Sequence, residues 1–145
     1  MKIHEINIYQ EFDSPVEAVW EAFNDHASFG KINGLEVERI VDSTDKDNIN
    51  GVGSVRLIKI PMLPFEETVR KSEKSKLIEY QVSRGTPLDH HYGKMVFESL
   101  PGNRSSLNYS ISVGSKIPLI GWVVKSGLQK GIAGGLSKYA ARLKK

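Results

Sequence analysis

The stretch FDSPVEAVWEAFND, residues 12–25, joins an extended segment to a helix with almost no loop between them. Pro15 fits the first helical position, because the N–H that proline lacks would have no helical partner there. The Ser14 hydroxyl can accept a hydrogen bond from the first turn, and Glu17, three residues on, completes a capping-box pattern. The stretch therefore predicts a helix over residues 15–24. Its apolar face consists of Val16, Val19, Trp20 and Phe23.

Regular patterns continue on both sides of this stretch. Residues 2–12 alternate apolar and polar side chains, with Ile6 and Phe12 on one face, as in a half-buried strand. Residues 25–33 predict a second short helix that stops at Gly34. Strands are then expected over residues 35–41, 54–60, 65–73, 76–83, 90–100 and 105–113, followed by a long helix over 118–145.

This order of elements predicts the fold class. A run of strands beside segregated helices is typical of an α+β fold, in which helices cover one face of an antiparallel sheet. A chain of 145 residues is expected to form a single domain, residues 1–145. The side chains expected to face its core include Leu35, Val37 and Val41 from the strand at 35–41 and Val124, Leu128, Ile132, Leu136, Tyr139 and Leu143 from the long helix.

Composition narrows the class of protein further. Hydrophobic residues make up 39% of the chain and charged residues 26%, as in an ordinary water-soluble globule. The chain has no cysteine, which excludes disulfides and thiolate chemistry. The longest apolar stretch, IPLIGWVV at 117–124, is far shorter than the roughly 20 residues of a membrane span. No secretory signal peptide is visible, so we expect a cytoplasmic protein.

The net charge of +3 is mild, but basic residues gather near the C-terminus. They are Lys125, Lys130, Lys138, Arg142, Lys144 and Lys145. Two interpretations are open: a solvated helix face, or a surface for an anionic partner such as a membrane or RNA.

Turns at residues 61–64, 74–75 and 101–103 indicate which residues of neighbouring strands lie opposite each other, and opposed residues share a face. The expected pairs are Ile60–Phe65, Ile58–Glu67, Arg56–Val69, Val69–Tyr80, Glu67–Val82, Phe97–Leu107, Met95–Tyr109 and His91–Val113. One face is then apolar except for five polar or amphipathic side chains. These are Arg56, Glu67, Tyr80, His91 and Tyr109.

Arg56 and Glu67 are expected to lie diagonally across adjacent strands, within reach of each other. Charges on an apolar face are costly to bury unless they are paired or hydrated. In one interpretation, one of them lies at the sheet edge or the two merely satisfy each other. In the other, they line a water-accessible cavity and orient a polar group of a ligand.

The pair His90-His91 does not predict a metal site. Adjacent residues of a strand point to opposite faces, so the two rings cannot easily hold one ion. We expect neither a metal nor another cofactor. His91 is interpreted as a residue of a cavity rim or turn, with a catalytic role as the alternative.

The long helix carries Gly127, Gly131 and Gly135 at every fourth position. Each helical glycine costs up to about 1 kcal/mol relative to alanine. Either close packing on the sheet requires them, or the missing side chains leave space for a ligand beneath the helix.

Several segments together resemble the SRPBCC superfamily of START-like proteins, and its polyketide cyclase/dehydrase branch in particular. They are residues 6–25, 51–56, 67–69, 78–88 and 91–97. The similarity extends over nearly the whole chain. One departure is Tyr109, where that branch often has a tryptophan in the last strand.

The resemblance implies the helix-grip fold. In it, a curved antiparallel sheet of about seven strands surrounds a long C-terminal helix, and two short helices follow the first strand. An apolar cavity lies between the sheet and the long helix. Members of the superfamily bind lipids, sterols, polyketides and other hydrophobic molecules, and several are not enzymes.

Binding of a small hydrophobic or amphipathic molecule, lipid-like or polyketide-like, is the favoured hypothesis. The polar anchors are then Arg56 and Glu67, and Tyr80 and Tyr109 supply walls with hydroxyl groups. The apolar lining is expected to include Ile58, Phe65, Met95, Phe97, Trp122 and Leu128.

Two other classes of function stay open. One is an enzyme of the polyketide cyclase/dehydrase type that uses Glu67 or His91 as its acid or base. The other is an interaction module that makes a weak contact with a membrane surface or a ribosome through its basic C-terminal helix. DNA is not an expected partner, and the chain is expected to be a monomer or a homodimer.

Overall fold

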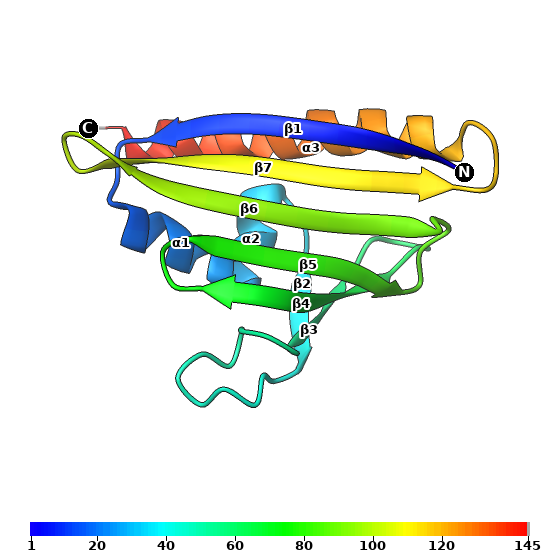
Figure 1. Ribbon diagram of the computed structural model, residues 1–145, viewed down its shortest axis with the longest axis horizontal. Coiled ribbons are helices and arrows are strands. Elements are labelled where there is room, and N and C mark those ends of the chain that lie inside the picture. The colour runs from blue at the N-terminus through cyan, green and yellow to red at the C-terminus, as the bar shows by residue number, and fades with distance from the viewer. Residues whose placement is uncertain (145) are drawn as a thin grey trace.

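Within residues 1–144, which the computed structural model describes, seven strands form one antiparallel sheet in the order β1-β7-β6-β5-β4-β3-β2 (Figure 1). The strands are β1 (Lys2–Phe12), β2 (Val37–Val41), β3 (Val55–Ile58), β4 (Phe65–Glu73), β5 (Leu77–Arg84), β6 (His90–Leu100) and β7 (Arg104–Ser115). The helices are α1 (Val16–Asn24), α2 (His26–Asn33) and α3 (Ile120–Leu143). Lys145, one of the basic residues grouped above, lies outside the described residues.

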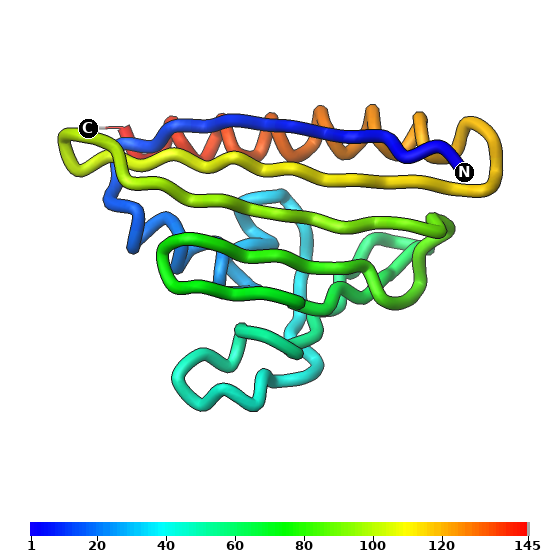
Figure 2. The backbone as a smooth tube through the Cα atoms, in the orientation of Figure 1, coloured from blue at the N-terminus to red at the C-terminus, as the bar shows by residue number. Residues whose placement is uncertain are grey.

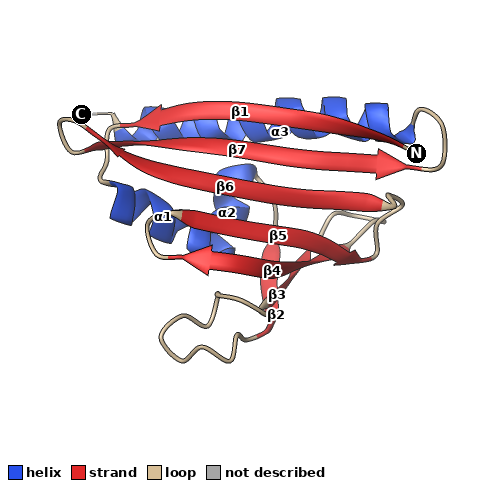
Figure 3. Cartoon of the chain, viewed as in Figure 1, coloured by secondary structure: helices blue, strands red, loops and turns tan. Residues whose placement is uncertain are grey.

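The helices α1, α2 and α3 lie on one face of the sheet (Figure 3). Along its length, α3 runs beside β1 and β7, whereas α1 and α2 follow β1 directly and cover part of the remaining strands. This is the expected α+β architecture with a helix-grip arrangement, which is confirmed. No helix among residues 1–144 is long and apolar enough to cross a membrane.

The predicted helix after β1 is confirmed, but its predicted capping box is wrong. Pro15 has an extended backbone and occupies the N-cap position, and no side chain caps this helix. The Pro15 carbonyl accepts hydrogen bonds from the first turn instead. Ser14 faces β7, where its carbonyl oxygen accepts a hydrogen bond of 2.8 Å from the Ser105 hydroxyl. The predicted apolar face is buried as expected, with Val16, Val19, Trp20 and Phe23 each at most 7% exposed.

The second helix has a cap that the sequence pattern did not single out. An Asp25 carboxylate oxygen accepts a hydrogen bond of 3.0 Å from the backbone N–H of Ser28. At the other end, Gly34 adopts the left-handed conformation with φ of 69°, which ends the helix as predicted. The two caps fix where α2 begins and ends, and with it the position of the side chains that α2 turns toward the sheet.

Most of the predicted strand register is confirmed. The confirmed pairs are Val69–Tyr80, Glu67–Val82, Met95–Tyr109, Phe97–Leu107 and His91–Val113. At β2 one expectation is wrong, because Val41 is 48% exposed and does not face the core. The register between β2 and β3 shifts between Arg39 and Val41, and such a bulge re-aims the side chains beyond it.

The register between β3 and β4 differs from the predicted one by two residues. The expected pair of Ile58 with Glu67 is wrong, because β3 ends at Ile58 and residues 59–64 all belong to the connecting loop. Arg56, expected opposite Val69, lies directly opposite Glu67. A shift of two residues preserves the face to which each side chain points, so both charged residues stay on the helix-covered face.

The closest packing lies under the C-terminal half of α3. Leu136 of α3 is fully buried there, beside an aromatic cluster whose ring centroids are 5.5 to 6.4 Å apart. The cluster consists of Phe12, Phe23, Phe97 and Tyr139. Met95 belongs to the same hydrophobic core and is 0% exposed. This end of the sheet is therefore filled.

The glycines of α3 divide between the two interpretations that the sequence left open. A Cβ atom at Gly135 would lie 2.6 Å from the Ile32 carbonyl oxygen, so close packing against α2 requires glycine there. A Cβ atom at Gly127 or Gly131 would meet nothing within 4 Å. These two glycines leave open space, and of the three at every fourth position only Gly135 is needed for packing.

We expect opposite effects from alanine at two neighbouring glycines of α3. Gly134 is exposed and has open space around it, so Gly134→Ala should stabilise the protein by up to about 1 kcal/mol through helix propensity. Gly135→Ala should destabilise it by about 1–3 kcal/mol, because the new methyl group would collide with the backbone of α2. Urea denaturation of the two variants checks this. Equal effects would contradict the packing described here.

Candidate functional site

A cavity of about 330 Å³ lies between the sheet and the N-terminal half of α3. Its apolar lining includes Phe29, Ile58, Phe65, Leu88, Leu128 and Ile132. Its polar lining consists of Asn33, Glu67, Tyr80, Thr86, His91 and Tyr109. Space is present here because Gly127 and Gly131, which also line the cavity, carry no side chains.

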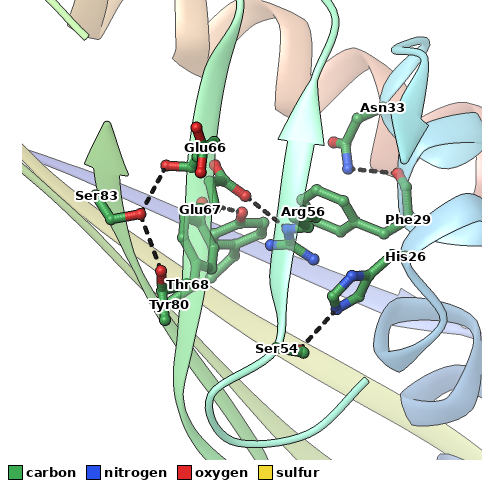
Figure 4. Close-up of polar contacts among 11 residues, drawn as sticks. His26, Phe29, Asn33, Ser54, Arg56, Glu66, Glu67, Thr68, Tyr80 and Ser83 are labelled. Atoms are coloured by element: carbon green, nitrogen blue, oxygen red, sulfur yellow. Dashed lines mark hydrogen bonds and ion pairs between the residues drawn. The ribbon is translucent and has the colours of Figure 1, made fainter. Parts of the chain in front are cut away.

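Arg56 and Glu67 form a buried ion pair at the floor of this cavity (Figure 4). Arg56 Nε lies 2.7 Å from Glu67 Oε1, and the two side chains are 1% and 5% exposed. The guanidinium carbon lies 3.7 Å from the centroid of the Phe29 ring and 4.9 Å from that of Tyr80, so two aromatic faces add cation–π contacts. Glu67 lines the cavity, and Arg56 holds it from behind.

The contacts agree with the interpretation that the two charges satisfy each other, and the orientation of a ligand by this pair stays a prediction. The two charges satisfy each other, and one of them also faces the cavity. Burial raises the pKa of Glu67 above its ordinary value, and the Arg56 charge and hydrogen bond oppose that rise. Arg56 Nη2 has no hydrogen-bond partner among the described residues, so Glu67 satisfies only part of the guanidinium.

Two tyrosines from neighbouring parts of the sheet meet beside Glu67. The hydroxyl oxygens of Tyr80 and Tyr109 are 2.5 Å apart, and the two rings are nearly perpendicular at 88°. Burial raises the pKa of both phenols, and the negative charge of Glu67 raises each further, so both are neutral at neutral pH. The pair has two hydroxyl protons and uses one in its own hydrogen bond, which leaves one donor for another acceptor.

The position of the Tyr80 ring depends on Gly93, its cross-strand partner on β6. A Cβ atom at Gly93 would lie 2.2 Å from Tyr80 Cζ and 2.6 Å from its hydroxyl oxygen. The ring therefore lies directly on the glycine backbone. This is how a side chain from β5 reaches across β6 to Tyr109 on β7.

Three histidines surround the polar residues in different ways. His91 lines the cavity, and burial lowers its pKa to about 4, with a further contribution from His90. The His90 ring bonds the Ser112 hydroxyl at 2.7 Å. His26 lies behind Arg56, 3.4 Å from the Ser54 hydroxyl, and burial together with the Arg56 charge lowers its pKa to about 3 (Figure 4). The imidazoles of His26 and His91 are therefore neutral at neutral pH, and His90 is not among the residues that line the cavity.

Seven of the residues singled out in the sequence line the cavity: Ile58, Phe65, Glu67, Tyr80, His91, Tyr109 and Leu128. Arg56 lies behind Glu67, and Met95 and Phe97 belong to the filled core instead. Trp122, expected in the apolar lining, is 58% exposed. It lies two residues, or about 200° of helical rotation, before Val124, which does line the cavity.

The lining also contains residues that sequence reasoning missed. Phe29 belongs to the second predicted helix, and its place above Arg56 depends on how α2 sits on the sheet. Leu63, Thr86 and Leu88 come from two loops that show no periodic pattern. The prolines that flank Leu63 were the one sequence signal that this loop is held in a defined shape.

The curved sheet that surrounds α3, with a cavity between them, is the helix-grip fold. The chain is similar in structure to a START superfamily protein from Mycobacterium smegmatis, with a TM-score of 0.77, 14% identity, and coverage of 97% of this chain and 99% of that one. No family model matches the chain, and no curated protein matches its sequence.

Two further solved structures have the same fold. Ara h 8.0201 has a TM-score of 0.70 and 15% identity, over 97% of this chain and 99% of that chain. Norcoclaurine synthase from Thalictrum flavum, solved in complex with dopamine and hydroxybenzaldehyde, has a TM-score of 0.67 and 12% identity, over 99% of this chain and 90% of that one. At these identities the comparisons show a shared fold.

A double-mutant cycle tests the buried ion pair. Arg56→Met leaves a buried carboxylate without its partner, and Glu67→Met leaves a buried guanidinium, so each should destabilise the fold by about 3–5 kcal/mol. The double variant, with two apolar side chains, should be more stable than either single variant. Urea denaturation measures all three. Strictly additive losses would show that the two side chains are not coupled.

Proposed function

We propose that this protein binds a small, mainly apolar molecule that carries one polar group, with that group seated on Glu67 and the Tyr80–Tyr109 pair. One observation supports this above all: the cavity is apolar over most of its lining, and three of its polar groups, Glu67, Tyr80 and Tyr109, lie close together. Cavities of this kind hold small ligands, and about 330 Å³ lies at the small end of the usual range of roughly 300–1,000 Å³.

The floor defines the chemistry of the polar group. The tyrosine pair offers one hydroxyl proton, and the Glu67 carboxylate offers an acceptor. Because Arg56 already balances the charge of Glu67, the ligand does not need to supply a cation. A hydroxyl or carbonyl group, which is neutral, complements this floor, and lipid-like or polyketide-like molecules carry such groups on an apolar body.

A matched pair of cavity variants tests ligand binding. We expect the neutral fluorescent probe N-phenyl-1-naphthylamine to bind the native protein. Gly131→Leu should weaken binding by about tenfold or more, because its side chain enters the cavity. Gly134→Leu adds the same side chain to the same helix, outside the cavity, and should bind like the native protein. Equal binding by both variants would place the probe elsewhere.

An enzyme of the polyketide cyclase/dehydrase type is the second candidate, favoured by the raised pKa of Glu67 at the cavity floor. Burial moves the pKa of this carboxyl group toward neutral pH, which suits a general acid or base. A tyrosine hydroxyl beside it can donate a hydrogen bond to a carbonyl oxygen of the substrate. His91 is the weaker choice, because a lowered pKa makes its imidazole a poor base.

Deuterium uptake by a small 1,3-diketone in heavy water tests the second candidate. If Glu67 acts as a base, the native protein should accelerate exchange at the carbon between the carbonyl groups, and Glu67→Gln should lose at least about a hundredfold of that rate. Mass spectrometry measures the exchange, and binding of the fluorescent probe shows that the variant still folds. Acceleration that persists in Glu67→Gln would exclude this carboxylate as the base.

A further inference from the structure

Three loops gather at the end of the molecule where the cavity lies. A Cβ atom at Gly85, in the β5–β6 loop, would lie 2.6 Å from the Pro64 carbonyl oxygen of the β3–β4 loop. An Asp89 carboxylate oxygen of the β5–β6 loop accepts a hydrogen bond of 2.6 Å from the backbone N–H of Lys116, in the β7–α3 loop. These contacts connect all three loops, and Figure 1 shows the β7–α3 loop beside the beginning of α3.

The cavity opens to solvent at this end. Several lining residues are themselves exposed, and they mark its mouth: Leu63, Gly85, Pro87, Gly127 and Gly131. They come from the β3–β4 loop, the β5–β6 loop and α3. The mouth is therefore bounded by two loops on one side and by Gly127 and Gly131 of α3 on the other.

Large apolar side chains are exposed to water in the loops and the helix turn at this end of the molecule. Six of them, in the β3–β4 loop, the β7–α3 loop and the first turn of α3, are each at least 57% exposed. We call them the apolar rim: Met62, Leu63, Ile117, Leu119, Trp122 and Val123. Single exposed apolar residues are common, but six in two loops and one helix turn, with Leu63 among them lining the cavity, indicate an interaction surface.

The backbone holds two rim residues in conformations that bulky side chains rarely adopt. Met62 has φ of 70° and Leu119 has φ of 74°, and these side chains are 97% and 77% exposed. Left-handed backbone of this kind is costly for residues other than glycine and asparagine. Neither side chain is buried in return, so packing within the chain does not account for the geometry.

Charge indicates the chemistry of the partner. The sequence has no Asp or Glu after Glu98, whereas α3 and its flanks are rich in lysine. Lys130 and Lys138 follow Val123 at spacings of seven and fifteen residues, which places them along the same side of α3. Asp89 is the acid that contacts the β7–α3 loop, and its carboxylate is bonded to the backbone there.

Lysine is depleted at protein–protein interfaces. In contrast, lysine beside tryptophan and aliphatic side chains is typical of helices that lie on anionic membrane surfaces. We propose that the apolar rim inserts into the surface of an anionic lipid bilayer, with the mouth of the cavity facing the lipid. Docking needs no ligand, and only passage of a ligand between bilayer and cavity rests on the proposed function.

Sedimentation with lipid vesicles tests the docking. Ligand-free native protein should bind vesicles of equal parts phosphatidylcholine and phosphatidylglycerol, bind pure phosphatidylcholine more weakly, and lose affinity as salt is added. Val123→Glu should weaken binding to the anionic vesicles by about tenfold, because a carboxylate replaces an inserted apolar side chain. On contact with these vesicles, emission from exposed Trp122 should shift to the blue, and Trp122→Phe should abolish the shift.

The chain offers a matched control. Val52 is 51% exposed, against 60% for Val123, and belongs to the loop between β2 and β3, which projects away from α3 (Figure 2). Val52→Glu should bind vesicles like the native protein. Equal losses in the two variants, or no binding of the native protein to anionic vesicles, would overturn the proposal.

Sedimentation velocity separates a bilayer from a second copy of the chain. A homodimer that Val123→Glu dissociates, without vesicle binding by the native protein, would assign the apolar rim to a dimer interface and overturn membrane docking. Binding of N-phenyl-1-naphthylamine reports the cavity independently. Vesicle binding without probe binding would leave docking in place and remove the ligand-binding function alone.

Discussion

The contact between α3 and the rest of the molecule is uneven along the helix, and the cavity depends on this difference. Near Leu136 and Tyr139 the helix packs closely, and Gly135 brings it against the backbone of α2. One and two turns earlier, Gly131 and Gly127 meet nothing. One helix thus closes a solid core at one end and roofs an open space at the other. Protein interiors are usually close-packed, so side chains would fill this space if Gly127 and Gly131 were larger residues.

The floor of the open space carries charges that an apolar cavity would ordinarily exclude. Arg56 and Glu67 are opposite each other on β3 and β4, so neither needs to reach far to form the ion pair. The rings of Phe29 and Tyr80 cover the Arg56 guanidinium, whereas the Glu67 carboxylate faces the cavity. A buried ion pair contributes little net stability in most proteins. Its effect here is to hold one carboxylate at a fixed place in the wall of an otherwise mainly apolar cavity.

Much of this architecture was predictable, because its signals are local. The bounds of β4 and β6 follow from alternation and from the turns beside them, and the face of each side chain survives the two-residue error between β3 and β4 because the pleat repeats every two residues. The charged floor was found for the same reason. Trp122 shows the limit, since the apolar character of a residue does not tell which side of a helix it occupies when the helix start is uncertain.

The remainder of the site depends on tertiary placement. Phe29 covers Arg56 only because Asp25 and Gly34 fix the ends of α2, and Leu63 and Leu88 reach the cavity from loops without a repeating pattern. The failed capping box is similar: Ser14 has the right chemistry, but the helix starts one residue later, with Pro15 at the N-cap, and the Ser14 carbonyl is bonded to Ser105 of β7. Local patterns fix the elements and their faces, and the loops and helix positions follow from contacts distant in sequence.

Gly93 extends this dependence to the hydroxyl pair. The Tyr80 ring lies on the backbone of Gly93, and its hydroxyl oxygen can occupy this position only because Gly93 has no Cβ atom. Gly93 is not among the residues that line the cavity, so it acts on the site only through the Tyr80 ring. Under the proposed function, exchange of this one glycine changes the ligand preference through the Tyr80 hydroxyl, while every lining residue stays the same.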